Sequence, residues 1–82
     1  MNIRINLQYF AQLQEQRGLG HEALELQQAT TARELYQQLQ QQHNFTLPIG
    51  VLRPAINGQY RGWDTELQEG DTAVFIPPVA GG

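Results

Sequence analysis

Residues 31–43 have the pattern of an amphipathic helix, and this segment most constrains the fold. Thr31 and Glu34 match the capping box Ser/Thr-x-x-Glu, which satisfies free N–H groups at a helix start. Apolar positions then recur at three- and four-residue spacing, at Ala32, Leu35, Tyr36, Leu39 and His43. The opposite face is glutamine, which we interpret as solvated surface: Gln37, Gln38, Gln40, Gln41 and Gln42. A single helix with one apolar face can cover only one face of a sheet.

Two segments before this helix have the pattern of strands. Residues 3–9 alternate between apolar and polar positions, and residues 23–27 do so again. Residues 11–17 between them suit a short helical turn, stopped by Gly18 and Gly20. The two strands are therefore expected to form a hairpin with a long connection.

Three further strands are expected after the helix. Asn57-Gly58 is a strong hairpin signal, joining residues 55–56 to a return strand at 59–61. Pro54 restricts its strand to a sheet edge or a strand start. After a tight turn at 67–71, residues 72–76 form the last strand. The predicted fold class is α+β: a mixed sheet of about five strands covered by one main helix.

Composition excludes several functions. The chain has 82 residues, which suits one domain, here residues 1–76, followed by a tail at 77–82. It has no cysteine and no serine, so thiolate metal sites, cysteine nucleophiles and serine nucleophiles are excluded. The net charge of −3, with no lysine, argues against nucleic acid and anionic membranes as partners and leaves a basic protein partner open. Without a signal peptide or membrane-spanning run, a cytoplasmic location is expected.

The remaining titratable residues give no clear active site. His21 and His43 lie far apart and have no neighbouring carboxylates at ligand spacing, so no metal site is expected. Four acidic residues gather around one turn, and we interpret them as a solvated turn, with a basic partner as the alternative: Asp64, Glu66, Glu69 and Asp71.

The last strand and Phe10 indicate a partner surface. Residues 73–76 are all apolar, so both faces of that strand are apolar although only one helix is available to cover them. Phe10 falls on the polar side of the first strand's alternation. We predict an exposed patch containing Phe10 and Ile76, because exposed apolar patches mark partner surfaces. Trp63 is interpreted instead as a lid on the core edge.

The chain's last six residues are Pro77-Pro78-Val79-Ala80-Gly81-Gly82. The two prolines favour an extended path, and six extended residues reach about 20 Å. The two glycines leave the end without side chains. A frayed terminus is the ordinary alternative. The combination favours a carboxylate that is presented to another protein.

The sequence resembles the family of small subunits of molybdopterin synthase, which are ubiquitin-like β-grasp sulfur carriers. The resemblance spans nearly the whole chain. It rests on Tyr9-Phe10-Ala11 with Glu15, Ile56-Asn57, Leu67-x-x-Gly70-Asp71, and above all residues 75–82, Phe-Ile-Pro-Pro-Val-Ala-Gly-Gly. Gln14 and Thr72 depart from the usual family pattern.

The resemblance implies a specific chemistry for the tail. An adenylating activating enzyme would use ATP to activate Gly82, and a persulfide sulfur donor would then convert it to a thiocarboxylate. Residues 77–81 would enter a channel in the large catalytic subunit, where the sulfur is transferred to cyclic pyranopterin monophosphate. The chain itself would bind no cofactor and would work in a heterotetramer with two large subunits. The alternatives are a carrier for thiamine thiazole synthesis, a ubiquitin-like protein modifier, and an interaction module with an idle tail.

Overall fold

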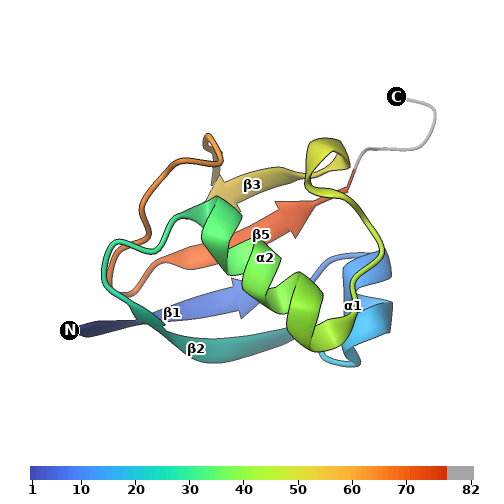
Figure 1. Ribbon diagram of the computed structural model, residues 1–82, viewed down its shortest axis with the longest axis horizontal. Helices are drawn as coiled ribbons and strands as arrows, with labels where there is room; N and C mark the ends of the chain where they lie inside the picture. Colours follow the sequence, from blue (N-terminus) through green and yellow to red (C-terminus); the bar gives the residue numbers. More distant parts are fainter. Residues whose placement is uncertain (78–82) are drawn as a thin grey trace.

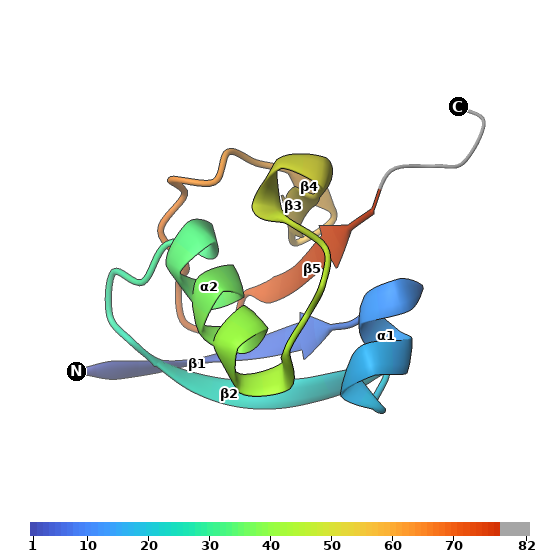
Figure 2. The ribbon, with the colours of Figure 1, turned by 45° about the vertical axis from the view of Figure 1, so that its right-hand side comes forward.

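In the computed structural model, which describes residues 1–77, the chain begins with a long antiparallel hairpin. Strand β1 (Asn2–Gln8) pairs along its length with β2 (His21–Gln27). Helix α1 (Gln12–Arg17) lies in the connection, at one end of the hairpin (Figure 2). Gly18 ends α1 in the left-handed conformation, with φ of 81°. The predicted hairpin with its long connection is confirmed, and β2 begins two residues earlier than predicted.

The alternation of apolar and polar residues in β1 matches their burial, because only one face of the strand is covered. Ile5 and Leu7 are fully buried, whereas Asn6 between them and Gln8 after them are exposed. Tyr9 follows the same parity and is buried just beyond the end of the strand. The period of two in the sequence therefore predicted which side chains face the core.

Helix α2 (Ala32–His43) forms as its sequence predicts. The Thr31 hydroxyl accepts from the Glu34 N–H at 3.2 Å, and a Glu34 carboxylate oxygen accepts from the Thr31 N–H at 2.9 Å. Asn44 ends the helix with φ of 56°. Gln40 is the exception on the glutamine face: it is half-buried and donates to the carbonyl of Leu47 at 3.4 Å.

The second half of the chain completes a five-stranded mixed sheet. A single 3-10 turn, η1 (Ile49–Val51), leads into β3 (Arg53–Ile56), β4 (Gln59–Tyr60) and β5 (Thr72–Ile76). The strand order is β2-β1-β5-β3-β4, with β1 and β5 parallel and the other neighbours antiparallel. Helix α2 crosses one face of this sheet (Figure 1). The chain thus has the predicted α+β arrangement with a ubiquitin-like fold.

The core lies between α2 and the covered face of the sheet. Tyr36 of α2 meets Phe75 of β5 edge to face at 5.1 Å between ring centroids. Trp63 stacks on Phe75 at 5.6 Å and stays half-buried, so its predicted role as a lid on the core edge is confirmed. The other fully buried large side chains are Ile5, Leu7, Leu13, Leu35 and Leu39.

Within residues 1–77, the opposite face of the sheet carries no helix, and its two halves differ in polarity. Because paired residues share a face, the register assigns Asn6, Gln8 and His21 to a mainly polar half, which also contains Ala23. The same register assigns Val74 and Ile76, with Ala55 and Tyr60, to a mainly apolar half, in which Arg53 is the charged exception. The prediction that both faces of the last strand are apolar is confirmed in this sense.

Pro54 does not lie at a sheet edge, because β3 pairs with β5 on one side and β4 on the other. Its carbonyl accepts from the Arg61 N–H at 3.0 Å, and the N and C=O of one strand residue point to the same side. The side of Pro54 that has no N–H therefore faces β4. The two residues of β4 pair with Ala55 and Ile56, and not with Pro54. Pro54 is the second residue of β3, so the alternative placement near a strand start is the correct one.

Neither α1 nor α2 is long and apolar enough to cross a membrane.

Candidate functional site: a groove beside the tail

The tail begins at the end of a central strand. Strand β5 pairs with β1 through Val74 and with β3 as far as Ile76, whose partner is Arg53. Pro77 follows and is half-buried. The proposed sulfur-carrying Gly82, with Gly81, Ala80, Val79 and Pro78, lies outside the described residues. The start of the tail is thus held by paired backbone on a rigid sheet.

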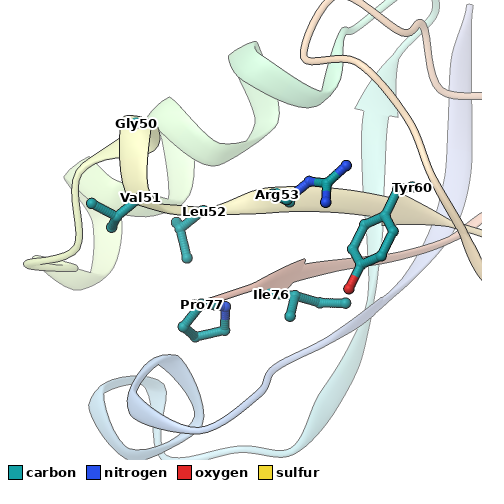
Figure 3. Close-up of a pocket in the computed structure, with 7 residues that line it drawn as sticks. All are labelled: Gly50, Val51, Leu52, Arg53, Tyr60, Ile76 and Pro77. Atoms are coloured by element: carbon teal, nitrogen blue, oxygen red, sulfur yellow. The ribbon is translucent and has the colours of Figure 1, made fainter. Parts of the chain in front are cut away.

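A groove of about 440 Å³ lies where the chain leaves the sheet (Figure 3). Val51 and Leu52 line it at the end of η1, Arg53 and Tyr60 line it from β3 and β4, and Ile76 comes from β5. Gly50 and Pro77 complete the lining. Val51 is 40% exposed and Tyr60 54% exposed. Large apolar side chains left this open are typical of partner surfaces.

Arg53 and Tyr60 form one wall of the groove as a stacked pair. The guanidinium carbon of Arg53 lies 4.2 Å from the centre of the Tyr60 ring. Figure 3 shows the Arg53 side chain directed toward that ring. Within residues 1–77, no carboxylate lies within ion-pair distance of Arg53. Sequence reasoning missed this pair, since residues 53 and 60 come together only through the hairpin.

Of the two predicted interface residues, Ile76 lines the groove and Phe10 does not. Phe10 is 55% exposed and lies two residues after the end of β1. The next residue, Ala11, has φ of 51° and ψ of −123°, a backbone conformation that glycine normally adopts. The chain therefore leaves β1 through a strained turn, and Phe10 remains exposed beside it.

The acidic turn is more ordered than predicted. Asp71 is buried, and its carboxylate accepts from the side-chain amide of Asn57 at 2.9 Å and the N–H of Gln68 at 2.8 Å. Glu69 accepts from the N–H of Arg4 at 3.0 Å. The interpretation as a solvated turn is therefore wrong for Asp71, which ties the turn to the β3–β4 hairpin. It remains correct for Asp64 and Glu66, which are exposed.

A second polar cluster, absent from the predictions, joins α1 to the sheet. Arg17 donates to both carboxylate oxygens of Glu22, at 3.0 and 3.1 Å, and the Tyr9 hydroxyl donates to the same carboxylate. The Arg17 guanidinium lowers the pKa of Glu22, and burial, aided by that carboxylate, raises the pKa of Tyr9. Because every group in the cluster is hydrogen-bonded, we interpret the cluster as structural: it holds the end of α1 against β2.

The two histidines lie on different elements. His43 packs near Phe45, with ring centroids 5.6 Å apart, while His21 is exposed at the start of β2. Among residues 1–77, no three histidine or acidic side chains gather closely enough to hold a metal ion.

Comparison with known proteins places the chain in a family. The profile of the ThiS family matches residues 7–82. No curated protein matches significantly. A Pyrococcus furiosus protein, provisionally assigned as molybdopterin converting factor subunit 1, is 28% identical with a TM-score of 0.80, covering 94% of this chain and 99% of its own.

Two further solved structures extend the comparison. The complex of subunits 1 and 2 of molybdopterin-converting factor from Helicobacter pylori contains a chain 25% identical, with a TM-score of 0.65 and coverage of 98% and 100%. Small archaeal modifier protein 1 from Haloferax volcanii shares the fold, with a TM-score of 0.76, 20% identity and coverage of 96% and 99%. The resemblance found in the sequence is thereby confirmed: the chain belongs to the ThiS family.

Proposed function

We propose that the chain is the sulfur carrier subunit of a molybdopterin synthase and that Gly82 carries the sulfur. The observation that carries the proposal is similarity over nearly the whole chain to one chain of the Helicobacter pylori complex of subunits 1 and 2 of molybdopterin-converting factor, and to the Pyrococcus furiosus protein provisionally assigned as subunit 1. The Pro-Pro-Val-Ala-Gly-Gly sequence supports it, and the ThiS family match includes this segment.

The proposed chemistry begins with a poor leaving group. Oxide is not displaced from a carboxylate, so an activating enzyme would first join the Gly82 carboxylate to the adenylyl group of ATP, which releases pyrophosphate. The persulfide of a donor protein would then displace AMP to give an acyl disulfide, and a second thiol would reduce its S–S bond to release the thiocarboxylate. This thiocarboxylate would attack cyclic pyranopterin monophosphate in the large subunit. Gly81 and Gly82 suit this role because they add no side chain to a narrow channel. Residues 77–80 would form the stalk that reaches the channel.

The described residues support this role by holding the start of the tail. Backbone pairing of β5 reaches Ile76, and Pro77 restricts φ at the next position. A tail that starts from a paired strand loses less conformational freedom on entering a partner than one starting from a loop. The chain would act in a cytoplasmic heterotetramer with two large subunits.

Intact-mass measurement tests the proposal directly. The chain is produced together with its activating enzyme and a persulfide donor, and the expected product has one oxygen replaced by sulfur. Deletion of Gly82 should abolish both this product and molybdopterin formation, with an unchanged thermal melt. Molybdopterin formation by the chain lacking Gly82 would contradict the proposal.

A ubiquitin-like protein modifier is the second candidate, because the chain shares its fold with small archaeal modifier protein 1. A modifier would be joined through Gly82 to lysine side chains of other proteins. Denaturing gels of cells that contain the tagged chain distinguish the two functions. Stable high-mass adducts that need Gly82, without sulfur on the free chain, would favour the modifier.

A further inference from the structure

The groove beside the tail has apolar surfaces but contains one charge, that of Arg53, with no carboxylate partner among residues 1–77. Val51, Tyr60 and Ile76 contribute apolar surface, while the Arg53 guanidinium stacks on Tyr60. Water can solvate this cation in the free protein, since Arg53 is exposed. A partner that covered the groove with apolar groups alone would strip that water and leave a buried, unpaired charge, which is costly.

From this arrangement we infer that the groove binds a partner segment that presents an apolar side chain together with one aspartate or glutamate carboxylate. The guanidinium has a planar set of donors that matches a carboxylate with two parallel hydrogen bonds. Stacking on Tyr60 restricts its orientation before the partner arrives, so less side-chain entropy is lost on binding. This inference rests on the proposed function, and the segment belongs to the synthase large subunit.

The location of the groove supports a protein that also receives the tail. Pro77 lines the groove and is the residue from which the tail continues. A partner that encloses residues 78–82 therefore approaches this same end of β5. The net charge of −3 opposes binding of polyanions such as nucleic acid, so a single carboxylate is the more compatible anion.

The inference also refines an expectation from composition. The overall negative charge left a basic partner open, and the exposed acids Asp64 and Glu66 could still meet one. At the groove the sign is reversed, since the one charged residue that lines it, within the part of the chain that the structure describes, is Arg53. The partner surface is therefore expected to be locally acidic where it meets β3 and β5.

Calorimetric titration with the synthase large subunit tests the inference, using the full chain. Arg53→Gln should weaken binding roughly 10- to 100-fold, as expected for loss of a charge-assisted hydrogen bond. Arg61→Gln is the matched control: Arg61 is an exposed arginine one residue after β4 and does not line the groove. The control should change the dissociation constant less than about twofold.

Two further variants separate charge from stacking. Arg53→Lys keeps the charge but loses the planar donor set, so it should bind with intermediate affinity. Tyr60→Leu keeps an apolar wall but removes the stacking surface, and it too should weaken binding. Raising the salt concentration should weaken the wild type more than Arg53→Gln. Thermal melts of all variants should match the wild type, because both side chains are exposed.

Several results would overturn the inference. Equal affinity of Arg53→Gln and wild type would show that no carboxylate meets Arg53. In the free full chain, nuclear Overhauser contacts between the Tyr60 ring and Val79 or Ala80 would show that the chain's own tail is the occupant. If the wild type fails to bind the large subunit and gains no sulfur with its activating enzyme, the proposed function fails as well. Binding and sulfur loading with no effect of Arg53→Gln would refute the groove inference alone.

Discussion

At the scale of single residues, two carboxylates join separate segments of the chain. The Asp71 carboxylate is buried and accepts hydrogen bonds from the side-chain amide of Asn57 and the N–H of Gln68. Glu22 occupies an inward-facing position of β2 and is paired with Arg17. The cost of burying these two carboxylates is offset because their oxygens are hydrogen-bonded.

The Glu22 cluster predicts a pH dependence of stability. Hydrogen bonds from Arg17 lower the pKa of Glu22 below its ordinary value of 4.5, with smaller contributions from Tyr9 and His43. A carboxyl whose folded pKa is lowered stabilises the protein above the unfolded value and loses this contribution as the pH falls through the folded value. Wild type should therefore lose stability below about pH 4.5, and Glu22→Gln, which cannot titrate, should lose less.

Urea unfolding at about pH 6 and about pH 3 measures this difference, expected as roughly a few tenths molar in the shift of the midpoint. Glu25→Gln is the control on the same strand, because Glu25 is exposed and belongs to the polar half of the open face. If Glu22→Gln and Glu25→Gln both lose as much stability between the two pH values as the wild type does, the Glu22 cluster does not contribute to the pH dependence.

At the scale of elements, turn residues decide where strands end. Asn57 and Gly58 both have positive φ, 53° and 83°, as a two-residue hairpin requires. This turn places Tyr60 opposite Ala55 and so brings its ring to Arg53. The local signal was readable from the sequence, but its consequence for the groove depended on the side-chain positions that the hairpin creates.

Gly58→Ala should destabilise the protein by about 1–2 kcal/mol, because a side chain at positive φ meets its own backbone. Beyond Gly58 and its two neighbours in the chain, no atom lies within 4 Å of an added Cβ, so the cost comes from the local backbone conformation alone. Gly62→Ala is the matched control, with equally open space and no positive φ. Its effect on urea unfolding should stay within about 0.5 kcal/mol. Equal effects would contradict a conformational origin.

At the scale of the whole molecule, β5 joins the core to the partner surface. Phe75 points to α2 and is 1% exposed, whereas its neighbour Ile76 points to the open face and lines the groove. One strand thus serves both stability and binding through its two faces. The same strand leads into the tail, so the rigid core and the proposed reactive end are adjacent in the chain.

Adjacent substitutions should separate these roles. Phe75→Ala should cost about 3–5 kcal/mol in urea unfolding, since it empties a packed aromatic site. Ile76→Ala should cost only about 1 kcal/mol, because Ile76 is half-buried. It should nevertheless weaken binding to the large subunit by roughly tenfold. The reverse ranking, with Ile76 the more damaging to stability, would place that residue in the core.

The sequence alone determined the features that depend on near neighbours in the chain. Helix α2 with its caps, the parity of β1 and β5 and the Asn57-Gly58 turn follow from local backbone preference and from the period of apolar residues. The β-grasp assignment and the carrier family came from the resemblance, which spans the same elements.

Only the tertiary structure decided which distant residues meet. The placement of β5 between β1 and β3, the burial of Asp71 and the Glu22 cluster all join segments that no local pattern links. The groove likewise needs η1, β3, β4 and β5 together. The physical reason is that such contacts depend on the energy of the whole packed chain. In that energy, the pairing of residues that are distant in the sequence can outweigh the local conformational preference of each segment.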